Sequence, residues 1–251
     1  MRVVVTRPQG QAQPLIQAIE QQGVETVALP LLEIKPFSPQ ASEARVIVEK
    51  IQHLHHYQHL IFVSTNAIDC AFDWIERILP AVPTGLRWYP IGQASAQRLA
   101  DYAVQAEQSG VNMDSEGLLA NAHLQQLTGQ KVLIFRGQGG RMLLHDELTR
   151  RGAQVEFCEL YQRKNIAYAV GTLKRLLADK VDSFIASSVQ TVQALLQQAE
   201  KEQAQAELLS TALIVPGQRV ANYAKSAGFS QVFASQNAGT AAIIKTLNSI
   251  R

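Results

Sequence analysis

The sequence predicts an α/β protein built from two similar domains, and three observations lead to this fold class. Short apolar segments alternate with amphipathic helical patterns along all 251 residues, an order typical of parallel sheets covered by helices on both faces. Segments of the first half reappear in the second half at a nearly constant distance. The hydrophobic content of 47% and charged content of 18% are those of a globular protein.

The repeating unit is clearest between residues 132 and 163. Val132 to Phe135 is apolar and too short for a helix, so it predicts a buried strand. A glycine-rich turn from Arg136 to Gly140 follows, then an amphipathic helix and a second strand that ends at Tyr161. Glycines let the backbone bend sharply and leave amides free to meet a ligand, so this turn is a candidate binding loop.

The same strand-turn-helix-strand pattern opens the chain, which indicates an internal duplication. Arg7 matches Arg136 at a distance of 129 positions, and Ser64 matches Ser187 at a distance of 123. The motif IGQASA resembles PGQRVA at a distance of 125. A period near half the chain is far too long for a solenoid repeat and fits two similar domains.

The other elements follow in regular alternation. Helices are predicted where apolar residues recur three or four positions apart, first at residues 12–19 and last at residues 243–247. One helix is expected near residues 118–127. Prolines at 30, 36 and 39 interrupt the pattern, as do residues 162–167, so both segments are candidate linkers. The predicted strands are Val3–Val5, Thr26–Leu29, Leu60–Val63, Trp88–Ile91, Val104–Ala106, Val132–Phe135, Val155–Leu160, Phe184–Ala186, Ala212–Val215 and Val232–Ala234.

Composition excludes several classes of function. The net charge is +2 and the basic residues are scattered, so no nucleic-acid partner is expected. Membrane-length apolar runs and a signal-peptide pattern are both absent from the sequence, so we expect a soluble cytoplasmic protein. Cys70 and Cys158 form no metal or disulfide framework. His53, His55 and His56 lack carboxylate or cysteine partners nearby, so no metal site is predicted.

The turns at the carboxyl ends of the predicted strands are the candidate binding site, because ligands of parallel α/β sheets bind there. Several of these turns begin helices, where free amides and the helix dipole favour carboxylate or phosphate. The candidate binding residues are Thr6, Arg7, Ser64, Thr65, Asn66, Ser95, Arg136, Gly137, Gly139, Ser187, Ser188, Gln218 and Arg219.

Each of these patterns also has a plainer interpretation. The serine and threonine pairs are good helix N-caps, and the arginines fit solvated charges. The glycine pair at 139–140 fits a flexible turn, and Tyr161 fits a half-buried strand aromatic with a wet hydroxyl. A dinucleotide fingerprint from Gly137 is excluded, because Met142 stands where the last glycine is required.

Taken together, the motifs resemble the uroporphyrinogen-III synthase family from Val3 to about Leu247. Their order and spacing, rather than any single motif, are characteristic. The resemblance is carried by VVVTRPQGQA with Gly23 and Pro30, IFVSTNAI, IGQASA, VLIFRGQGGR with Gly152 and Leu160-Tyr161-Gln162, FIASSVQTV, and a final Gly228-Phe229.

The resemblance implies two flavodoxin-like domains joined by two crossing strands, with the first domain discontinuous. Domain 1 would comprise residues 1–35 and 168–251, and domain 2 residues 40–163. Residues 36–39 and 164–167 would be the interdomain linkers. Two thin crossings predict hinge freedom between the domains.

For activity, the resemblance implies a cyclising lyase that closes the linear tetrapyrrole hydroxymethylbilane without a cofactor, in haem and sirohaem biosynthesis. The terminal hydroxyl leaves as water, and the last pyrrole ring attacks through its substituted carbon to give a spiro intermediate. Fragmentation and recombination then invert that ring. We expect a monomer with no membrane partner, to which the preceding pathway enzyme would hand the unstable substrate.

The resemblance also assigns roles to residues. The family's tyrosine falls on Tyr161, the expected acid for the leaving hydroxyl, and the family's hydroxyl residue in a Gly-Asn-Ala-Thr turn falls on Ser95. Arg219 stands where some relatives carry threonine. Because the substrate carries eight carboxylates and the net charge is only +2, backbone amides are expected to bind much of the acid, with Arg7, Arg136 and Arg219 in support.

Two alternatives remain open at this level. A two-domain protein that binds small anions without catalysis would share the double crossing, but it would usually carry an export signal. A pair of flavodoxin-like regulatory or nucleotide-binding domains would carry an acidic phosphate-accepting pocket or a glycine fingerprint. Neither the acidic pocket nor the glycine fingerprint is visible in the sequence.

Overall fold

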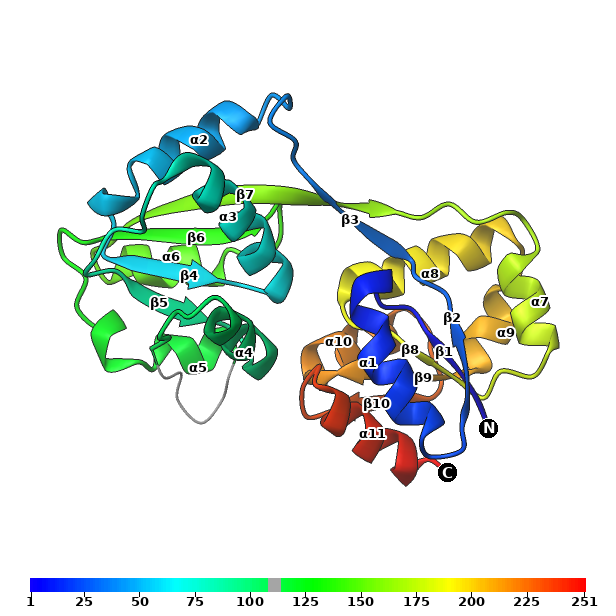
Figure 1. The fold of residues 1–251 in the computed structure, drawn as a ribbon. Coiled ribbons are helices and arrows are strands. Elements are labelled where there is room, and N and C mark those ends of the chain that lie inside the picture. The colour runs from blue at the N-terminus through cyan, green and yellow to red at the C-terminus, as the bar shows by residue number, and fades with distance from the viewer. Residues whose placement is uncertain (108–113) are drawn as a thin grey trace. The chain divides into compact units, whose positions relative to one another are not determined.

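Two five-stranded sheets organise the chain in the computed structural model, which describes residues 1–107 and 114–251. They belong to two units, Met1–Glu33 with Lys164–Arg251, here called domain 1, and Ile34–Arg163, here called domain 2 (Figure 1). Domain 1 holds both ends of the chain, so the chain passes between the domains twice. This confirms the predicted fold class of two α/β domains with a discontinuous first domain.

The sheet of domain 1 has the order β10-β9-β8-β1-β2, and all its neighbouring strands are parallel. Val3 and Val5 of β1 face helices α1 and α11, whereas Val4 faces α7, α8, α9 and α10. This alternation lets a strand with three consecutive valines be buried on both faces. The elements are β1 (Arg2–Val5), α1 (Gln9–Glu20), β2 (Glu25–Ala28), α7 (Thr172–Ala178), β8 (Ser183–Ile185), α8 (Val189–Lys201), α9 (Gln205–Ser210), β9 (Ala212–Pro216), α10 (Gly217–Ser226), β10 (Val232–Ser235) and α11 (Thr240–Ser249).

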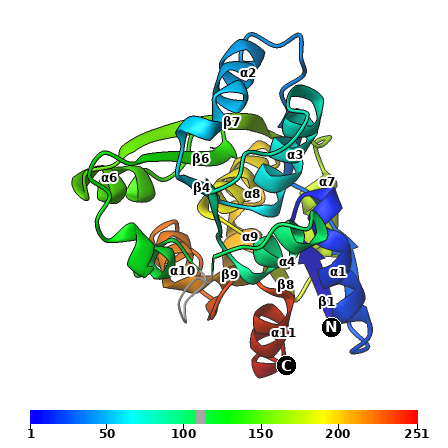
Figure 2. The same cartoon turned by 60° about the vertical axis from the view of Figure 1, so that its left-hand side comes forward.

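The sheet of domain 2 has the order β3-β7-β6-β4-β5. Helices α2 and α3 cover one face and α6 the other, as Figure 2 shows. The elements are β3 (Leu32–Pro36), α2 (Ala44–Gln52), η1 (Leu54–His56), β4 (His59–Phe62), α3 (Thr65–Ile78), β5 (Arg87–Pro90), α4 (Gln93–Asp101), α5 (Ser115–Leu119), η2 (Ala122–Leu124), β6 (Lys131–Gly137), α6 (Leu143–Arg150) and β7 (Gln154–Asn165).

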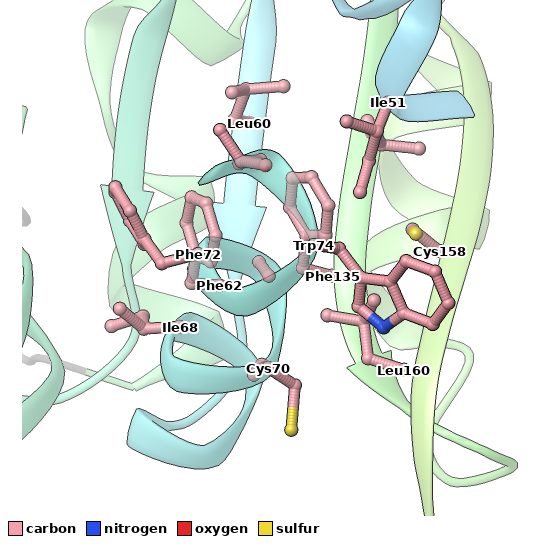
Figure 3. Close-up of a cluster of buried hydrophobic side chains, with 14 of the residues drawn as sticks. Ile51, Leu60, Phe62, Ile68, Cys70, Phe72, Trp74, Phe135, Cys158 and Leu160 are labelled. Carbon is pink, nitrogen blue, oxygen red and sulfur yellow. The ribbon is translucent and has the colours of Figure 1, made fainter. Parts of the chain in front are cut away.

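An aromatic core fixes α3 against this sheet (Figure 3). The ring of Phe62 stacks on Phe135 and Trp88, with centroids 4.7 and 5.5 Å away. Fully burying one such side chain stabilises the fold by about 1.5–3 kcal/mol. Phe72 of α3 stacks on Trp88 with centroids 5.9 Å apart, so the core holds α3 against the sheet.

Strands β3 and β7 form the two crossings, and β7 runs further than the sequence predicts. The amide of Phe37 donates to Leu160 O at 2.9 Å, and that of Ile166 donates to Leu31 O at 3.0 Å. Strand β3 was not predicted, because its flanking prolines suggest a break. A proline is tolerated at the end of an edge strand, which is the position of Pro36. The linker limits at 36–39 and 164–167 stay a prediction.

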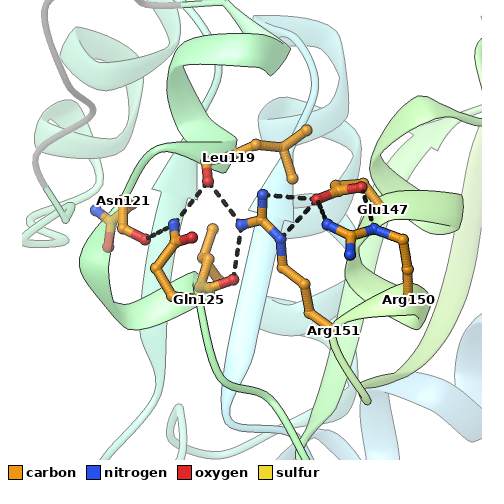
Figure 4. Close-up of polar contacts among 7 residues, drawn as sticks. Leu119, Asn121, Gln125, Glu147, Arg150 and Arg151 are labelled. Atoms are coloured by element: carbon orange, nitrogen blue, oxygen red, sulfur yellow. Dashed lines mark hydrogen bonds and ion pairs between the residues drawn. The ribbon is translucent and has the colours of Figure 1, made fainter.

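Two other expectations from the sequence are wrong. Val104 to Ala106 form no strand, although the amide of Glu107 donates to Trp88 O at 2.8 Å. The single helix expected at residues 118–127 is replaced by α5 and η2. Their terminal carbonyls, Leu119 O and Leu124 O, accept hydrogen bonds from Arg151 at 2.6 and 2.8 Å (Figure 4). The arginine satisfies carbonyls that a continuous helix would have bonded internally.

Within the described residues, no helix is both long enough and apolar enough to cross a membrane.

Candidate functional site

The carboxyl ends of the strands gather the predicted site residues at one edge of each sheet. In domain 1 the neighbouring strands β1, β8 and β9 are parallel, so the turns that follow them lie at the same edge. In domain 2 the same holds for β6, β4 and β5. The structure therefore brings together Thr6, Arg7, Ser187, Ser188, Gln218 and Arg219 in domain 1, and Ser64, Thr65, Asn66, Ser95, Arg136, Gly137 and Gly139 in domain 2.

The strand registers correct one match between the two halves. Val3 pairs with Ser183 in domain 1, and Val132, which lies 129 positions after Val3, pairs with His59 in domain 2. His59 and Ser183 are therefore equivalent, at a distance of 124 positions rather than 123. The structural counterpart of Ser64 is Ser188, and not Ser187 as the sequence comparison suggests.

Ser64 caps the 14-residue helix α3 and contacts the predicted catalytic residue. Its Oγ accepts a hydrogen bond from the amide of Ala67 at 3.2 Å. The same Oγ lies 3.0 Å from the hydroxyl oxygen of Tyr161. Thr65 and Asn66 occupy the first turn of α3 and are partly exposed. The helix N-terminus and the phenol thus meet at one serine.

Tyr161 is 1% exposed and belongs to the core of domain 2. It is therefore more deeply buried than the half-buried aromatic of the plainer interpretation. The ladder between β6 and β7 shifts register here, since Arg136 pairs with Glu159 and Gly137 pairs with Tyr161. This bulge places the consecutive residues Leu160 and Tyr161 in the same core cluster, which a regular strand would not do.

Gly137 lies against the ring of Tyr161. A Cβ atom at Gly137 would stand 2.4 Å from Cε2 of that ring. The amide of Gln138 donates to Tyr161 O at 2.7 Å, which fixes the backbone on the same side. The guanidinium carbon of Arg163 lies 5.4 Å from the ring centroid. The phenol is thus held by backbone, by the glycine and by Ser64.

The turn that follows β6 is closed on itself. Arg136 is 6% exposed, and its guanidinium donates to the carbonyls of Gly137 at 3.2 Å, of Arg141 at 3.1 Å, and of Gly139. Burial lowers the pKa of Arg136. The amide of Gly139 donates to the Glu159 carboxylate at 3.0 Å. Arg136 is thus not a solvated charge. Its contact with a substrate anion stays a prediction that requires these bonds to be exchanged.

In domain 1, Thr6 and Arg7 differ in whether their hydrogen-bond donors are already bonded to the protein. Thr6 is fully buried, and its hydroxyl donates to Ile185 O at 2.8 Å. Arg7 donates from a terminal nitrogen to Ala238 O. Its Nε is buried and has no hydrogen-bond partner among the described residues. Burial lowers the pKa of Arg7. Arg7 therefore keeps one donor that is not bonded to the protein, whereas the Thr6 hydroxyl is used.

Ser188 caps helix α8 as Ser64 caps α3. Its Oγ accepts from the amide of Thr191 at 3.2 Å and lies 2.9 Å from the hydroxyl oxygen of Thr191. Ser187 Oγ lies 3.4 Å from the same hydroxyl. The N-cap interpretation is therefore confirmed for Ser64 and Ser188. The contact of these serines with a ligand stays a prediction.

The remaining candidates begin helices α4 and α10. Gly92 and Gly217 precede or open these helices with φ of 91° and 72°, a left-handed conformation that favours glycine. Ser95 is only 3% exposed in the first turn of α4. Gln218 and Arg219 are both exposed, and Gln218 donates to Asn222 at 2.7 Å. The two turns thus share a backbone form but present different side chains.

A hollow of about 490 Å³ lies at the opposite edge of the domain 2 sheet. His59 and Arg87, the first residues of β4 and β5, line it together with His123. His59 is buried, bonds to Tyr89 and Gln130, and has a pKa lowered by that burial. Ligands of parallel sheets bind at the carboxyl ends, so this hollow is not the candidate site.

The rings of His53, His55 and His56 lie close together. The rings of His55 and His56 lie 4.2 Å apart between centroids, in an exposed cluster. Among the residues that the structure describes, no group of three His, Cys, Asp or Glu side chains is placed to hold a metal ion.

Comparison with known proteins adds an independent observation. The family model described as uroporphyrinogen-III synthase HemD matches residues 13–245. A uroporphyrinogen-III synthase of Proteus mirabilis is 34% identical over 171 residues, which cover 67% of this chain and 83% of the relative. That of Escherichia coli K12 is 29% identical over 98% of this chain and 100% of its own length.

Two solved structures have the same fold at low sequence identity. A mutant uroporphyrinogen III synthase of the extremely thermophilic bacterium Thermus thermophilus aligns with a TM-score of 0.65 at 14% identity, covering 99% of this chain and 98% of the other. The enzyme of Helicobacter pylori 26695 aligns with a TM-score of 0.62 at 16% identity, over the full length of both chains.

Proposed function

Because the chain belongs to the uroporphyrinogen-III synthase family, we propose that it converts hydroxymethylbilane to uroporphyrinogen III. The linear tetrapyrrole is closed with inversion of its terminal D ring and loss of water, as in haem and sirohaem biosynthesis. The match of the family model over residues 13–245 carries this proposal. The protein is accordingly a cyclising lyase.

The first chemical step is the departure of the terminal hydroxyl. The pyrrole nitrogen supplies the electron pair that expels it, and Tyr161 supplies the proton, so the C–O bond breaks and water leaves. The substrate becomes an azafulvene cation and the tyrosine a phenolate. The proximity of the Tyr161 hydroxyl to the N-terminus of α3 supports this role, because a helix N-terminus stabilises negative charge.

The later steps need confinement more than acid or base. The last ring attacks through its substituted carbon, and the spiro intermediate fragments and recombines. The phenolate recovers a proton when the ring carbon loses its own and aromaticity returns. Exclusion of water from the site would protect the cation from being trapped.

Backbone amides and a few arginines bind the substrate's carboxylates. The net charge of +2 is too small for pairwise neutralisation of eight carboxylates. The N-terminal turns of α3, α4, α8 and α10 offer amides at the sheet edges, where anions are favoured. The partly exposed side chain of Arg7 and the exposed side chain of Arg219 support contacts from domain 1.

The product isomer tests the proposed reaction. Purified protein is mixed with freshly made hydroxymethylbilane, and the oxidised porphyrins are separated by chromatography. We expect the type III isomer, whereas substrate left alone closes to the uninverted type I isomer. Type I alone, at the rate seen without protein, would favour an anion-binding protein without catalysis.

We also propose that the protein acts as a cytoplasmic monomer and receives its substrate from the preceding pathway enzyme. Instability of hydroxymethylbilane supports the transfer, because released substrate closes spontaneously. Light scattering after size-exclusion chromatography tests the monomer. Adding the preceding enzyme at equal total substrate tests the transfer, which predicts less type I product than with substrate added from solution.

A further inference from the structure

We infer that Ser64 and Gly137 are positioning residues that act on the reaction through Tyr161 rather than by touching the substrate. The inference deepens the proposed function and rests on it. The sequence places both residues among the substrate contacts. In the structure, both residues instead lie against the side chain of Tyr161.

The hydrogen bonds of Ser64 restrict the direction of its own proton. Its Oγ accepts the amide proton of Ala67 at 3.2 Å. The second neighbour of this oxygen is the Tyr161 hydroxyl at 3.0 Å. When Ser64 donates in this pair, the Tyr161 oxygen is an acceptor and the phenolic proton is free to leave.

This arrangement helps the phenol act as an acid. Transfer of the Tyr161 proton to the leaving hydroxyl breaks the phenolic O–H bond and leaves its electron pair on the phenolate oxygen. The Ser64 hydroxyl then donates a charge-assisted hydrogen bond to that oxygen, and the dipole of the 14-residue helix α3 acts in the same direction. Both effects are stronger in the transition state than in the resting protein.

Gly137 sets the position of the ring. A Cβ atom there would lie 2.4 Å from Cε2, 2.8 Å from Cζ and 2.9 Å from Cδ2 of Tyr161. These distances are too short for non-bonded carbon atoms. The atoms belong to a rigid ring that is 1% exposed and cannot turn aside freely. Only glycine leaves the phenol at hydrogen-bond distance from Ser64.

Domain 1 lacks the contact of a capping serine and a glycine with a tyrosine. This absence supports a specific role for Ser64 and Gly137 in domain 2. The residue 129 positions before Tyr161 is Leu32, and the residue 129 positions before Gly137 is Pro8. The equivalent of Ser64 is Ser188, whose hydroxyl meets Thr191 of its own helix. The helix cap is thus common to both domains, whereas the contact with a tyrosine is found only at Ser64 of the two caps.

Steady-state kinetics of Ser64→Ala, Tyr161→Phe and the double variant test the role of Ser64. We expect Ser64→Ala to lower kcat by roughly tenfold at unchanged KM, since one hydrogen bond to a developing charge is lost. Ser64→Thr retains the hydroxyl and should keep most of kcat. In the Tyr161→Phe background, removal of the Ser64 hydroxyl should cost nothing further in kcat, because the two residues act as a unit.

The outcomes separate this inference from the proposed function. Wild-type kcat in Tyr161→Phe would remove the acid from the proposed mechanism, whatever Ser64 does. A slow Tyr161→Phe variant in which Ser64→Ala still causes its full loss, or a Ser64→Ala variant with raised KM, would overturn the inference alone. Ser188→Ala, which removes a cap of the same 3.2 Å geometry, measures the loss of stability to be expected from the cap.

Gly137→Ala tests the steric part. We expect kcat to fall at least tenfold with an unchanged far-ultraviolet circular dichroism spectrum. Gly10→Ala is the matched control, because a Cβ at Gly10 would meet nothing within 4 Å, and it should leave kcat unchanged. If Gly137→Ala does not fold, the double variant Gly137→Ala/Tyr161→Leu should restore folding, since the smaller side chain vacates the space. Wild-type kcat in Gly137→Ala, or no rescue by the leucine, would overturn this part.

Discussion

The two domains begin equivalent helices in the same way but use the capping serine differently. Ser64 and Ser188 have nearly the same backbone angles, with φ and ψ of −169° and 166° in one and −163° and 166° in the other. In domain 2 the hydroxyl meets Tyr161, and in domain 1 it meets Thr191. The duplication has kept the cap, which the helix requires, while the second contact of the serine has diverged.

The equivalent arginines differ as well. Arg136 directs its guanidinium at three carbonyls of its own turn and thereby holds the turn closed. Arg7 instead donates to the carbonyl of Ala238, which belongs to a distant turn, and keeps a buried Nε without a partner among the described residues. The guanidinium of Arg136 is thus used to close its own turn, whereas that of Arg7 is less fully bonded to the protein. That Arg7 contacts the substrate stays a prediction.

The strongest test of this comparison is Tyr161→Phe. We expect the rate of type III formation to fall by about 10²- to 10⁴-fold, the usual contribution of a general acid, with type I product forming spontaneously instead. Tyr89→Phe is the matched control, because Tyr89 is also buried in domain 2 and its hydroxyl bonds to His59 at 3.0 Å. That variant should lose some stability and keep its isomer ratio. Equal losses in both variants would contradict a catalytic role.

Substitutions of the equivalent arginines Arg7 and Arg136 also test the comparison, with smaller expected effects than Tyr161→Phe. Arg136→Ala should lower the free energy of unfolding by about 2–3 kcal/mol, because it removes three hydrogen bonds from the turn and leaves the buried Gly137 carbonyl unpaired. Arg7→Ala should instead raise KM, by roughly tenfold for the loss of one charged contact. Urea unfolding and steady-state kinetics on both variants measure the two effects. The opposite pattern, with Arg7 structural and Arg136 binding, would reverse the assignment.

The smallest expected difference between the domains is in stability. It comes from two carboxylates whose contribution depends on pH. Glu147, beside Arg150 and Arg151, has a pKa lowered to about 2. Burial of Glu202 raises its pKa, but the amide of Lys174 and the side chain of Gln198 outweigh this and lower it below the usual value. Both pKa values are depressed by folding, so the stability they provide is present above pH ~4.5. It is lost as pH falls through the folded pKa.

Glu202→Gln and Glu147→Gln test this difference between the domains. Glu202 is 4% exposed and accepts from two backbone amides, so its variant should lose about 1–2 kcal/mol at pH 7. Glu147 is more exposed, and its variant should lose less. The deficit of each variant relative to the parent protein should shrink between pH 5 and pH 2 in thermal unfolding. A deficit that is the same at pH 3 and pH 7 would contradict the assigned origin.

The pattern of local apolar segments was enough to predict most of the fold. Ser64 and Ser188 lie directly before apolar helical patterns, so their capping role follows from neighbouring residues alone. The pairing of Ser64 with Tyr161 joins residues 97 positions apart and follows from no local pattern. It depends on strands β4, β6 and β7 being neighbours and on a register shift in the ladder.

Other contacts of the structure escape sequence patterns for the same reason. The glycines after Arg136 suggest free amides, but a carboxylate on the next strand, Glu159, accepts from one of them. Strand β3 is flanked by prolines, and only its partner β7 makes it a strand. In each case a residue distant in sequence supplies the decisive hydrogen bond, and periodicity cannot report such a partner.

The bulge in β7 makes the position of the Tyr161 ring sensitive to chain length. A strand directs successive side chains to opposite faces, so removing one residue between Glu159 and Tyr161 would turn the tyrosine towards α6 instead of α3. We therefore expect insertions and deletions in homologous chains to fall in the surface turns and to spare this short segment.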